Sequence, residues 1–430
     1  MAAVWQQCSR QKLSEPLPVH TARSGRSLLV QFYHAKLVTE RGLVEGELWM
    51  QHGVIVDPQE RFWQRDSTAA DRRIDCKGML LAPGFIDVHL RGACGVDFTA
   101  LGAAETPVEA AQRAVARVCQ QLPAYGVTSF CPTVGPSDPA SYRRLHSLLR
   151  PSQSEAAATL VGVHLDGPFL SGAYPNPSHD HARIRASLAG DSLATCYGPM
   201  LDDPDTTAAI VTLAPELDGG LGAVRALHAA GVVVGIGRTA ANLAECEQAV
   251  MAGATLVTDM FSCMQPFHHR DPGPVGLLAT DLETPRSIFY SLALDKGHAH
   301  QNTVNLAYCT NPEGLLVTSA GIAYPKEEGH HCTDRDAEAD AEGALVAGVR
   351  ALCNVTVNAR GEGGDPSSAL LCASHHPARL LGLANKGNLH PGSDADIVLL
   401  SEDLQVRATF VGGVLAWQHK EMNGAFWYYH

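Results

Sequence analysis

Residues 232–258 read VVVGIGRTAANLAECEQAVMAGATLVT, and this stretch decides the fold. It opens with the apolar run VVVGIG (232–237) and continues through AANLAECEQAVMAG (240–253), where apolar residues recur at helical spacing. It ends in a second apolar run, TLVT (255–258). Apolar runs of strand length that flank a helical stretch are typical of parallel strands joined by a helix. The stretch therefore predicts one strand–helix–strand unit.

The same alternation recurs between about residues 84 and 383. The apolar runs of strand length are GFIDV (84–88), VTSFCPT (127–133), LVGVHL (160–165), AIVTLAP (209–215), VVVGIG (232–237), TLVT (255–258), IFYSLAL (288–294) and LLVT (315–318). A further helical pattern, VEAAQRAVARVCQQLPAYG, occupies 108–126. Eight such units over about 300 residues favour an α/β fold of the (β/α)8 TIM-barrel type. A doubly wound open sheet is the alternative, but no GxGxxG follows the first strand to support its dinucleotide-binding form.

The two ends of the chain share a β-rich character. Residues 28–83 contain GVIVD (53–57) and all but the last residue of GMLLAPG (78–84), and residues 384–418 alternate apolar and turn residues in the manner of strands. We therefore expect a small composite β-sandwich domain from both chain ends. The expected division is a disordered extension at 1–27, the composite domain at 28–83 plus 384–418, the barrel at 84–383 and a tail at 419–430.

Composition narrows the class of partner. The chain of 430 residues has 45 acidic and 32 basic residues and a formal net charge of −13. This balance argues against a nucleic-acid surface, where lysine and arginine must neutralise phosphates. A small anionic ligand stays possible, because a single local cation can hold a phosphate.

Cysteine usage and hydropathy indicate the compartment. The 12 cysteines form no CxxC pair and are irregularly spaced, which indicates reduced thiols, so we expect a cytoplasmic protein. No run approaches the roughly 18 apolar residues of a membrane span. The extension 1–27 carries more basic than acidic residues, so an organelle transit peptide is an alternative to plain disorder.

One segment departs from the barrel pattern. Residues 326–342, KEEGHHCTDRDAEADAE, hold seven acids and two bases without an apolar period. We expect an exposed, mobile loop, with metal binding by His330 and His331 as the alternative.

Polar side chains follow nearly every predicted barrel strand. They are His89, Asp166, Glu216, Arg238, Asp259, Asp295, His298 and Ser319. Catalytic groups of a barrel stand at the carboxyl ends of its strands. Taken together, these residues predict a functional site on one rim.

Several ordered motifs resemble the N-acetylglucosamine-6-phosphate deacetylase family of the amidohydrolase superfamily. They are LLAPGFIDV (80–88), GVDF (95–98), GVTSFCPT (126–133), HLDGPF (164–169), TLAPE (212–216), PFHHRDPG (266–273), HPARLLGL (376–383) and ADIVLL (395–400). The resemblance implies a divalent metal such as Zn²⁺, a phosphosugar substrate and a homodimer. It also implies a metal-bound water, whose lowered pKa permits attack on an amide.

The positions of the family's metal ligands and general base are altered in this chain. Asp166 stands for the family's Glu, Arg238 and Asp259 stand for its two His ligands, and Ser319 replaces its catalytic Asp. A guanidinium stays protonated and cannot ligate a metal. In the segment after the sixth strand, Ser262 replaces the Asn that helps to hold the substrate.

Other positions keep the family pattern. By resemblance, Arg270 is the arginine that reaches the partner's substrate phosphate, and His298 contacts the substrate. Ser262 and its neighbour Cys263 are also expected on the substrate side. At the first strand His89 is present, but Arg91 stands where some members have a second His.

Three hypotheses remain open from the sequence. The first is a working deacetylase whose metal site is rebuilt from His89, Asp166 and Asp259, ligand types acceptable for Zn²⁺. The second is a catalytically degenerate member that binds a phosphosugar or a protein partner without hydrolysis. In that case Arg238 lies between Asp166 and Asp259 and replaces the metal's charge, because a buried carboxylate pair without a cation is costly. The third is another amidohydrolase reaction, for which Arg91 breaks the His-x-His pair and Glu216 stands where a lysine is required.

Overall fold

The computed structural model describes residues 28–59, 69–174, 180–190, 192–203, 208–280, 288–294, 299–319, 344–360, 366–422 and 427–429. The extension 1–27, the acidic segment 326–342, Asp295 and His298 lie outside these residues. Within the described ranges, no helix is long and apolar enough to cross a membrane.

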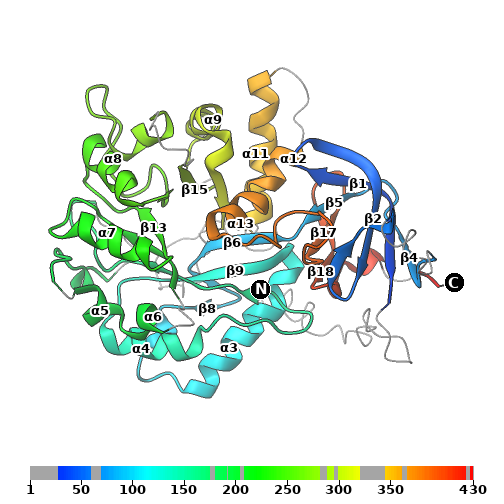
Figure 1. Cartoon of the computed structure of the whole chain (residues 1–430), viewed down its shortest axis with the longest axis horizontal. Coiled ribbons are helices and arrows are strands. Elements are labelled where there is room, and N and C mark those ends of the chain that lie inside the picture. Colours follow the sequence, from blue (N-terminus) through cyan, green and yellow to red (C-terminus); the bar gives the residue numbers. More distant parts are fainter. Residues whose placement is uncertain are drawn as a thin grey trace, which may run out of the picture.

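A parallel sheet forms the larger part of the molecule (Figure 1). Its strands are β6 (Phe85–Leu90), β9 (Val127–Val134), β10 (Thr159–Leu160), β11 (Val163–Asp166), β12 (Ala208–Leu213), β13 (Val233–Ile236), β14 (Leu256–Val257), β15 (Phe289–Ala293) and β16 (Leu315–Thr318). From β9 through β11 to β16, each strand pairs with the next in parallel, while β6 and the short β10 pair with β9. Each of the eight predicted apolar runs therefore contains a barrel strand.

The barrel is closed by a segment that belongs to neither of its end strands. No described residue of β16 pairs directly with β6 in the sheet. Instead, Ile86 of β6 donates its backbone N–H to the carbonyl of Ala373, and Val317 of β16 donates to that of Cys372. These bonds close the seam between the first and last strands. The α/β barrel expected from the sequence is thus confirmed.

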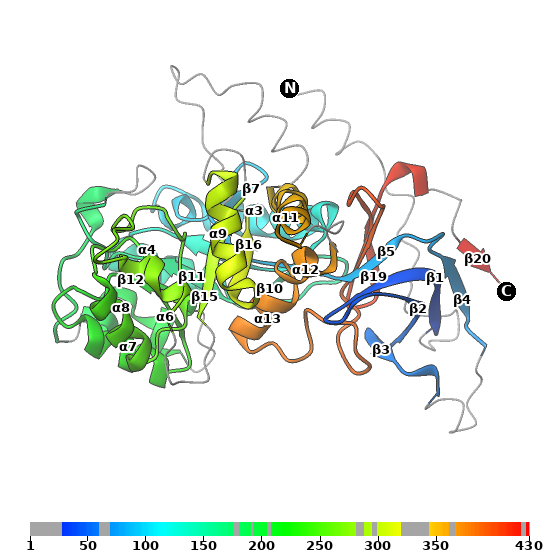
Figure 2. The same ribbon diagram turned by 90° about the horizontal axis from the view of Figure 1, so that it is seen from above.

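Helices surround the parallel strands on the outside (Figures 1 and 2). They are α3 (Val108–Gln121), α4 (Pro139–Leu148), α5 (Ser192–Tyr197), α6 (Pro199–Asp202), α7 (Gly220–Ala229), α8 (Leu243–Ala252), α9 (Gln301–Thr310), α11 (Ala344–Arg360), α12 (Pro366–Leu371) and α13 (His375–Leu381). Single 3-10 turns occupy Ala100–Gly102, Leu122–Tyr125, His181–Arg183, Gly273–Leu278, Pro312–Gly314 and Lys420–Met422. The stretch 232–258 forms the unit β13–α8–β14. Asn242 and Glu245 form a capping box at the start of α8.

Both chain ends build the second sheet. Its order is β19-β18-β17-β5-β1-β2-β3, with β4 paired to β1 and β20 paired to β4. The strands are β1 (Val30–Thr39), β2 (Gly42–Gln51), β3 (Val54–Val56), β4 (Arg72–Asp75), β5 (Leu80–Pro83), β17 (Ile397–Leu400), β18 (Val406–Val411), β19 (Val414–Gln418) and β20 (Trp427–Tyr429). Its core includes Phe32 and Phe410, whose rings meet edge to face with centroids 5.2 Å apart.

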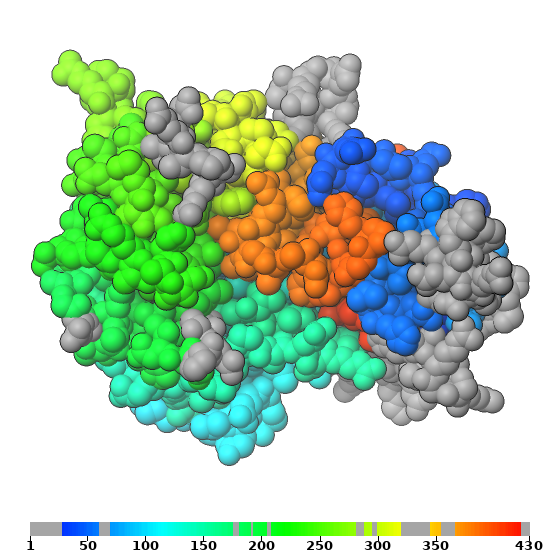
Figure 3. All heavy atoms as spheres, in the orientation of Figure 1, coloured from blue at the N-terminus to red at the C-terminus, as the bar shows by residue number. Residues whose placement is uncertain are grey.

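The composite β-sandwich domain is therefore present alongside the barrel. A small hairpin, whose strands β7 (Gly92–Ala93) and β8 (Val96–Asp97) have two residues each, follows β6. Between the two parts, α12 packs on β1 and β2, and the orange surface of this region lies beside the blue strands in Figure 3. Strand β20 lies beyond residue 418, in the segment expected to be a tail. The limits 28–83 plus 384–418 and 84–383 stay predictions for the two domains.

A largely buried ion pair fixes the segment that meets the start of the barrel. Lys386 lies 2.7 Å from Asp396 and 2.9 Å from Asp394. The side chain of Asp396 also accepts from the N–H of Gly412, and its backbone carbonyl accepts from Gly84 at the start of the barrel.

We predict that Lys386→Met lowers the free energy of unfolding by about 3–5 kcal/mol, because it leaves Asp396 buried without its cation. Chemical denaturation followed by circular dichroism measures the loss. The exposed Lys420→Met is the matched control and should change stability by less than about 0.5 kcal/mol. Equal effects of the two changes would contradict an anchoring role for Lys386.

Candidate functional site

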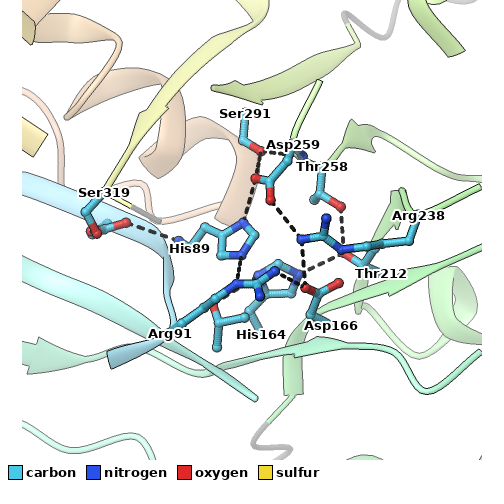
Figure 4. Close-up of polar contacts among 12 residues, drawn as sticks. His89, Arg91, His164, Asp166, Thr212, Arg238, Thr258, Asp259, Ser291 and Ser319 are labelled. Atoms are coloured by element: carbon cyan, nitrogen blue, oxygen red, sulfur yellow. Dashed lines mark hydrogen bonds and ion pairs between the residues drawn. The ribbon is translucent and has the colours of Figure 1, made fainter. Parts of the chain in front are cut away.

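Four barrel strands deliver charged side chains to one rim (Figure 4). His89 lies near the end of β6, Asp166 is the last residue of β11, and Arg238 and Asp259 closely follow β13 and β14. The carboxyl ends of parallel barrel strands share one face of the barrel, which explains the convergence. The structure thus brings together the first-strand His and the three altered ligand positions.

The turn after β13 is built to hold Arg238 in place. A Cβ at Gly237 would collide with Thr258 and Thr212, so only glycine allows β13 to approach both neighbouring strands this closely. The carboxylate of Glu216 then accepts from the hydroxyl of Thr239 and from the N–H of Ala240 at 2.7 Å. Glu216 therefore stabilises the turn that carries Arg238 by hydrogen bonds to the two residues after it.

Five side chains form a closed cycle, which we call the ion-pair ring: Arg91, Asp166, Arg238, Asp259 and His89. Arg91 Nη2 and Arg238 Nη2 both donate to Asp166 Oδ2, at 2.7 and 3.2 Å. Arg238 Nη2 also donates to Asp259 Oδ2 at 2.9 Å. His89 Nδ1 lies 3.0 Å from Asp259 Oδ1, and His89 Nε2 accepts from Arg91 Nε at 3.3 Å, which closes the cycle.

Arg238 is the central member of the ion-pair ring. Its single Nη2 bridges the carboxylates of Asp166 and Asp259, as the second sequence hypothesis expected. The side chains of Arg238 and Asp166 are only 4% and 1% exposed. Two arginines therefore balance two carboxylates, and the contact between Arg238 and Asp166 is almost completely shielded from water.

The ring stabilises the charged forms of its members. Burial alone would raise the pKa of Asp259, but the adjacent His89 and Arg238 outweigh it and hold that pKa below its usual range. Burial would likewise lower the pKa of Arg238, yet Asp166 and Asp259 more than offset this and raise it. Both groups therefore stay ionised at neutral pH.

A neutral layer lies beneath the ring. His164 is buried between Thr212 Oγ1 at 2.8 Å and Thr133 Oγ1 at 3.3 Å. Burial, with a contribution from His89, lowers the pKa of His164 to about 3, so its ring is uncharged near neutral pH. Its ring meets that of His89 edge-on with centroids 4.8 Å apart. His164 thus supports His89 without adding charge.

The backbone around the ring adopts costly conformations. Arg238, Asp259, Phe261 and Cys263 have φ values of 53°, 34°, 71° and 50°. Non-glycine residues in this region cost of order 1–3 kcal/mol each and cluster at functional sites. The four strained residues lie within or directly beside the ion-pair ring, which is the pattern expected of a functional site.

Ser319 lies outside the ring. Its hydroxyl donates to Asp87 Oδ2, and Asp87 Oδ1 accepts from the N–H of His89. Burial raises the pKa of Asp87. A neutral serine hydroxyl is a very weak base, and here it acts as the donor to Asp87, so the geometry gives no support to Ser319 as a general base.

The predicted substrate-side residues lie in two loops. Ser262 and Cys263 are half-buried in the strained turn after β14, where the N–H of Ser262 bonds the carbonyl of Asp259. Arg270 is exposed in the loop 266–273, and its N–H bonds His268 Nδ1. His298 lies outside the described residues, so its contact with a ligand stays a prediction.

The contacts of Arg91 were not predicted. We expected it on the rim, in place of the second His of a His-x-His pair, but not as a hydrogen-bond donor to both His89 and Asp166. The available signal was its spacing, because side chains two residues apart in a strand point to the same face.

A divalent metal does not fit this arrangement. Among the residues that the structure describes, no group of three or more His, Cys, Asp and Glu side chains is placed to hold an ion. The candidate ligands Asp166 and Asp259 both face Arg238, which repels a cation and offers no lone pair. We therefore assign no chemical step to a metal.

Known proteins resemble the chain over nearly all its length. The human N-acetylglucosamine-6-phosphate deacetylase is 39% identical over 407 residues, which cover 91% of this chain and 96% of that protein. The rat protein of the same name is also 39% identical and covers 93% of this chain and 99% of its own. The sequence model of the Amidohydrolase family matches residues 330–416.

Solved structures agree with these relatives. A mutant N-acetyl-D-glucosamine-6-phosphate deacetylase from Mycobacterium smegmatis, solved with N-acetyl-D-glucosamine-6-phosphate, is 27% identical with a TM-score of 0.69. The alignment covers 90% of this chain and 99% of that one. Together with the ordered motifs and the barrel, this similarity means that the chain belongs to the N-acetylglucosamine-6-phosphate deacetylase family.

Proposed function

We propose that this chain binds an N-acetylated amino-sugar 6-phosphate at the barrel rim and does not hydrolyse its amide. The observation that carries the proposal is the bridge from Arg238 to Asp166 and Asp259. The ligand class follows from the relatives, one of which was solved with N-acetyl-D-glucosamine-6-phosphate. The strained rim around Arg238 and Asp259 supports a retained binding role.

The absence of hydrolysis follows from the chemistry of the side chains at hand. An amide is a poor electrophile, so its hydrolysis needs an activated water and a group that takes a proton. Arg238 donates hydrogen bonds to the carboxylates of Asp166 and Asp259, and the hydroxyl of Ser319 donates to Asp87. Within the described part of the rim, no open set of metal ligands is therefore left to activate a water, and Ser319 is not placed to take a proton.

Hydrolysis is the competing function, and the 39% identity to proteins named deacetylases favours it. It would require Arg238 to leave both carboxylates, so that His89, Asp166 and Asp259 could hold one divalent ion such as Zn²⁺. Removing a buried guanidinium from two carboxylates is costly, which is why we prefer a resident arginine to a resident metal.

We also propose which residues around the ion-pair ring contact the ligand. Arg270, His298, Ser262 and Cys263 would contact the phosphosugar, with Arg270 reaching the ligand of a second subunit in a homodimer. The exposure of Arg270, and of Phe267 at 64%, is consistent with an interface at this loop. A cytoplasmic location is supported by the described cysteines, all of which are free thiols.

We predict that the purified protein contains far less than one equivalent of Zn²⁺ and releases no acetate from N-acetylglucosamine 6-phosphate, even with added metal. It should still show a ligand-dependent rise in melting temperature, because binding stabilises the folded state. Elemental analysis, an acetate assay and thermal-shift titration measure the three properties. Stoichiometric metal with steady acetate release would rule out the proposal, and a missing thermal shift would rule out its binding part.

Replacing the central arginine tests its part in the ring. Arg238→Met should lower the free energy of unfolding by about 3–5 kcal/mol, because Asp166 and Asp259 lose their shared cation. Adding Asp166→Asn and Asp259→Asn should recover much of this loss. Arg183→Met is the control: Arg183 pairs with Asp138 and Asp180 on the surface, where ion pairs contribute about 0–1 kcal/mol. Equal losses for Arg238→Met and the control, measured by denaturation, would contradict the role given to Arg238.

Restoring the family's residues tests whether the scaffold still accepts a metal. The combination of Arg238→His, Asp259→His and Ser319→Asp should bind Zn²⁺, measured by calorimetry. Adding Arg91→Gln should tighten binding further, because it releases Asp166 from its second guanidinium. Failure of both folded variants to bind Zn²⁺ would show that the rim differs from a metal site by more than these positions.

A further inference from the structure

The ion-pair ring has few hydrogen-bond acceptors left for a ligand. Asp259 uses Oδ1 toward His89 and Oδ2 toward Arg238. Asp166 accepts from both arginines through Oδ2 and is 1% exposed, so a ligand does not reach it. A ligand group that can only donate hydrogen bonds, such as an ammonium, therefore meets carboxylate oxygens that already pair with Arg238, Arg91 or His89.

Donors, in contrast, remain. Arg91 donates from Nε to His89 and from Nη2 to Asp166. No hydrogen bond joins its Nη1 to any other residue that the structure describes. Arg238 Nε is buried and likewise has no hydrogen-bond partner in the described part of the chain. A planar guanidinium offers five N–H donors, and each ring arginine uses only part of them. The surplus of donors matches a ligand oxygen.

Only one of these arginines reaches solvent. The side chain of Arg91 is 17% exposed, whereas that of Arg238 is 4% exposed. His89 and Asp166, which hold Arg91 on two sides, are buried. Arg91 is therefore the partly exposed arginine of the ring, and His89 and Asp166 hold its guanidinium in place (Figure 4).

We propose that Arg91 is a specificity-determining residue that donates from Nη1 to the carbonyl oxygen of the ligand's N-acetyl group. The inference rests on the proposed function, since it concerns the same ligand class. Under the proposed function the ligand carries an amide carbonyl, and the ring lies at the carboxyl ends of the barrel strands, where ligands of such barrels bind. A carbonyl oxygen accepts from Arg91, whereas the ammonium of the free amino sugar is repelled by it. The rim thus retains the acetylated sugar and rejects the deacetylated one.

The first experiment compares three ligands on the full-length protein by isothermal titration calorimetry. N-acetylglucosamine 6-phosphate should bind about 10- to 100-fold more tightly than glucosamine 6-phosphate or glucose 6-phosphate, the range for one hydrogen bond to a charged group. Arg91→Lys and Arg91→Gln should reduce this preference to less than about threefold. Arg150→Lys is the matched control, since Arg150 is an exposed arginine that pairs with Asp203, and it should keep the full preference.

A second measurement needs no variant. Phenylglyoxal modifies accessible arginines, and peptide mass spectrometry locates the modification. N-acetylglucosamine 6-phosphate should protect Arg91 of the wild-type protein, while glucose 6-phosphate at matched saturation should not.

The outcomes separate the two proposals. If no sugar phosphate binds, the proposed function itself fails, and this inference fails with it. If all three ligands bind equally, or if glucose 6-phosphate also protects Arg91, the guanidinium holds a phosphate and the acyl role is overturned while phosphosugar binding stands. A preference for the acetylated sugar that survives in either folded Arg91 variant overturns the assignment to Arg91. Should both variants unfold, the ligand ranking and the protection pattern of the wild-type protein decide the matter.

Discussion

The site depends on one guanidinium nitrogen that lies between the buried carboxylate of Asp166 and the largely buried carboxylate of Asp259. Arg238 Nη2 satisfies Asp166 and Asp259 together, and both would be very unfavourable in this position without a cation. The ring through Arg91 and His89, the glycine that lets β13 approach its neighbours and the strained turn after β14 all serve this contact. A side chain differs from a bound ion in that it cannot dissociate, so the charge balance of the rim is fixed when the chain folds.

This constraint makes the altered positions one coupled set. An arginine at 238 is tolerable only if carboxylates face it, and carboxylates at 166 and 259 are tolerable only with a cation between them. Arg91 adds a second guanidinium to Asp166, and His89 closes the cycle on Asp259. The family scaffold is kept around these residues, while the part of it that would activate water is replaced by groups that neutralise one another.

Much of this could be predicted from the sequence, because the relevant patterns are local. Apolar runs placed the barrel strands, and their carboxyl ends placed Arg238 between Asp166 and Asp259. What escaped prediction depends on contacts between distant segments. The closure of the ring by Arg91 depends on how the end of β6 turns toward β11, and the pairing of β20 with β4 joins residues more than 350 positions apart. No periodicity in the chain encodes such pairings.

The seam between β6 and β16 has a consequence for the order of synthesis. The carbonyls of Cys372 and Ala373 hold these strands together, and β17 to β19 supply one flank of the sheet that begins at β1. Neither the barrel nor the composite sheet can therefore be completed until residues 372–418 have left the ribosome. Until then β5 lacks its partner β17 and β6 lacks the carbonyl of Ala373, each about 300 residues downstream, and such exposed strand edges favour association with other chains. The nascent chain thus needs protection until these residues have been synthesised.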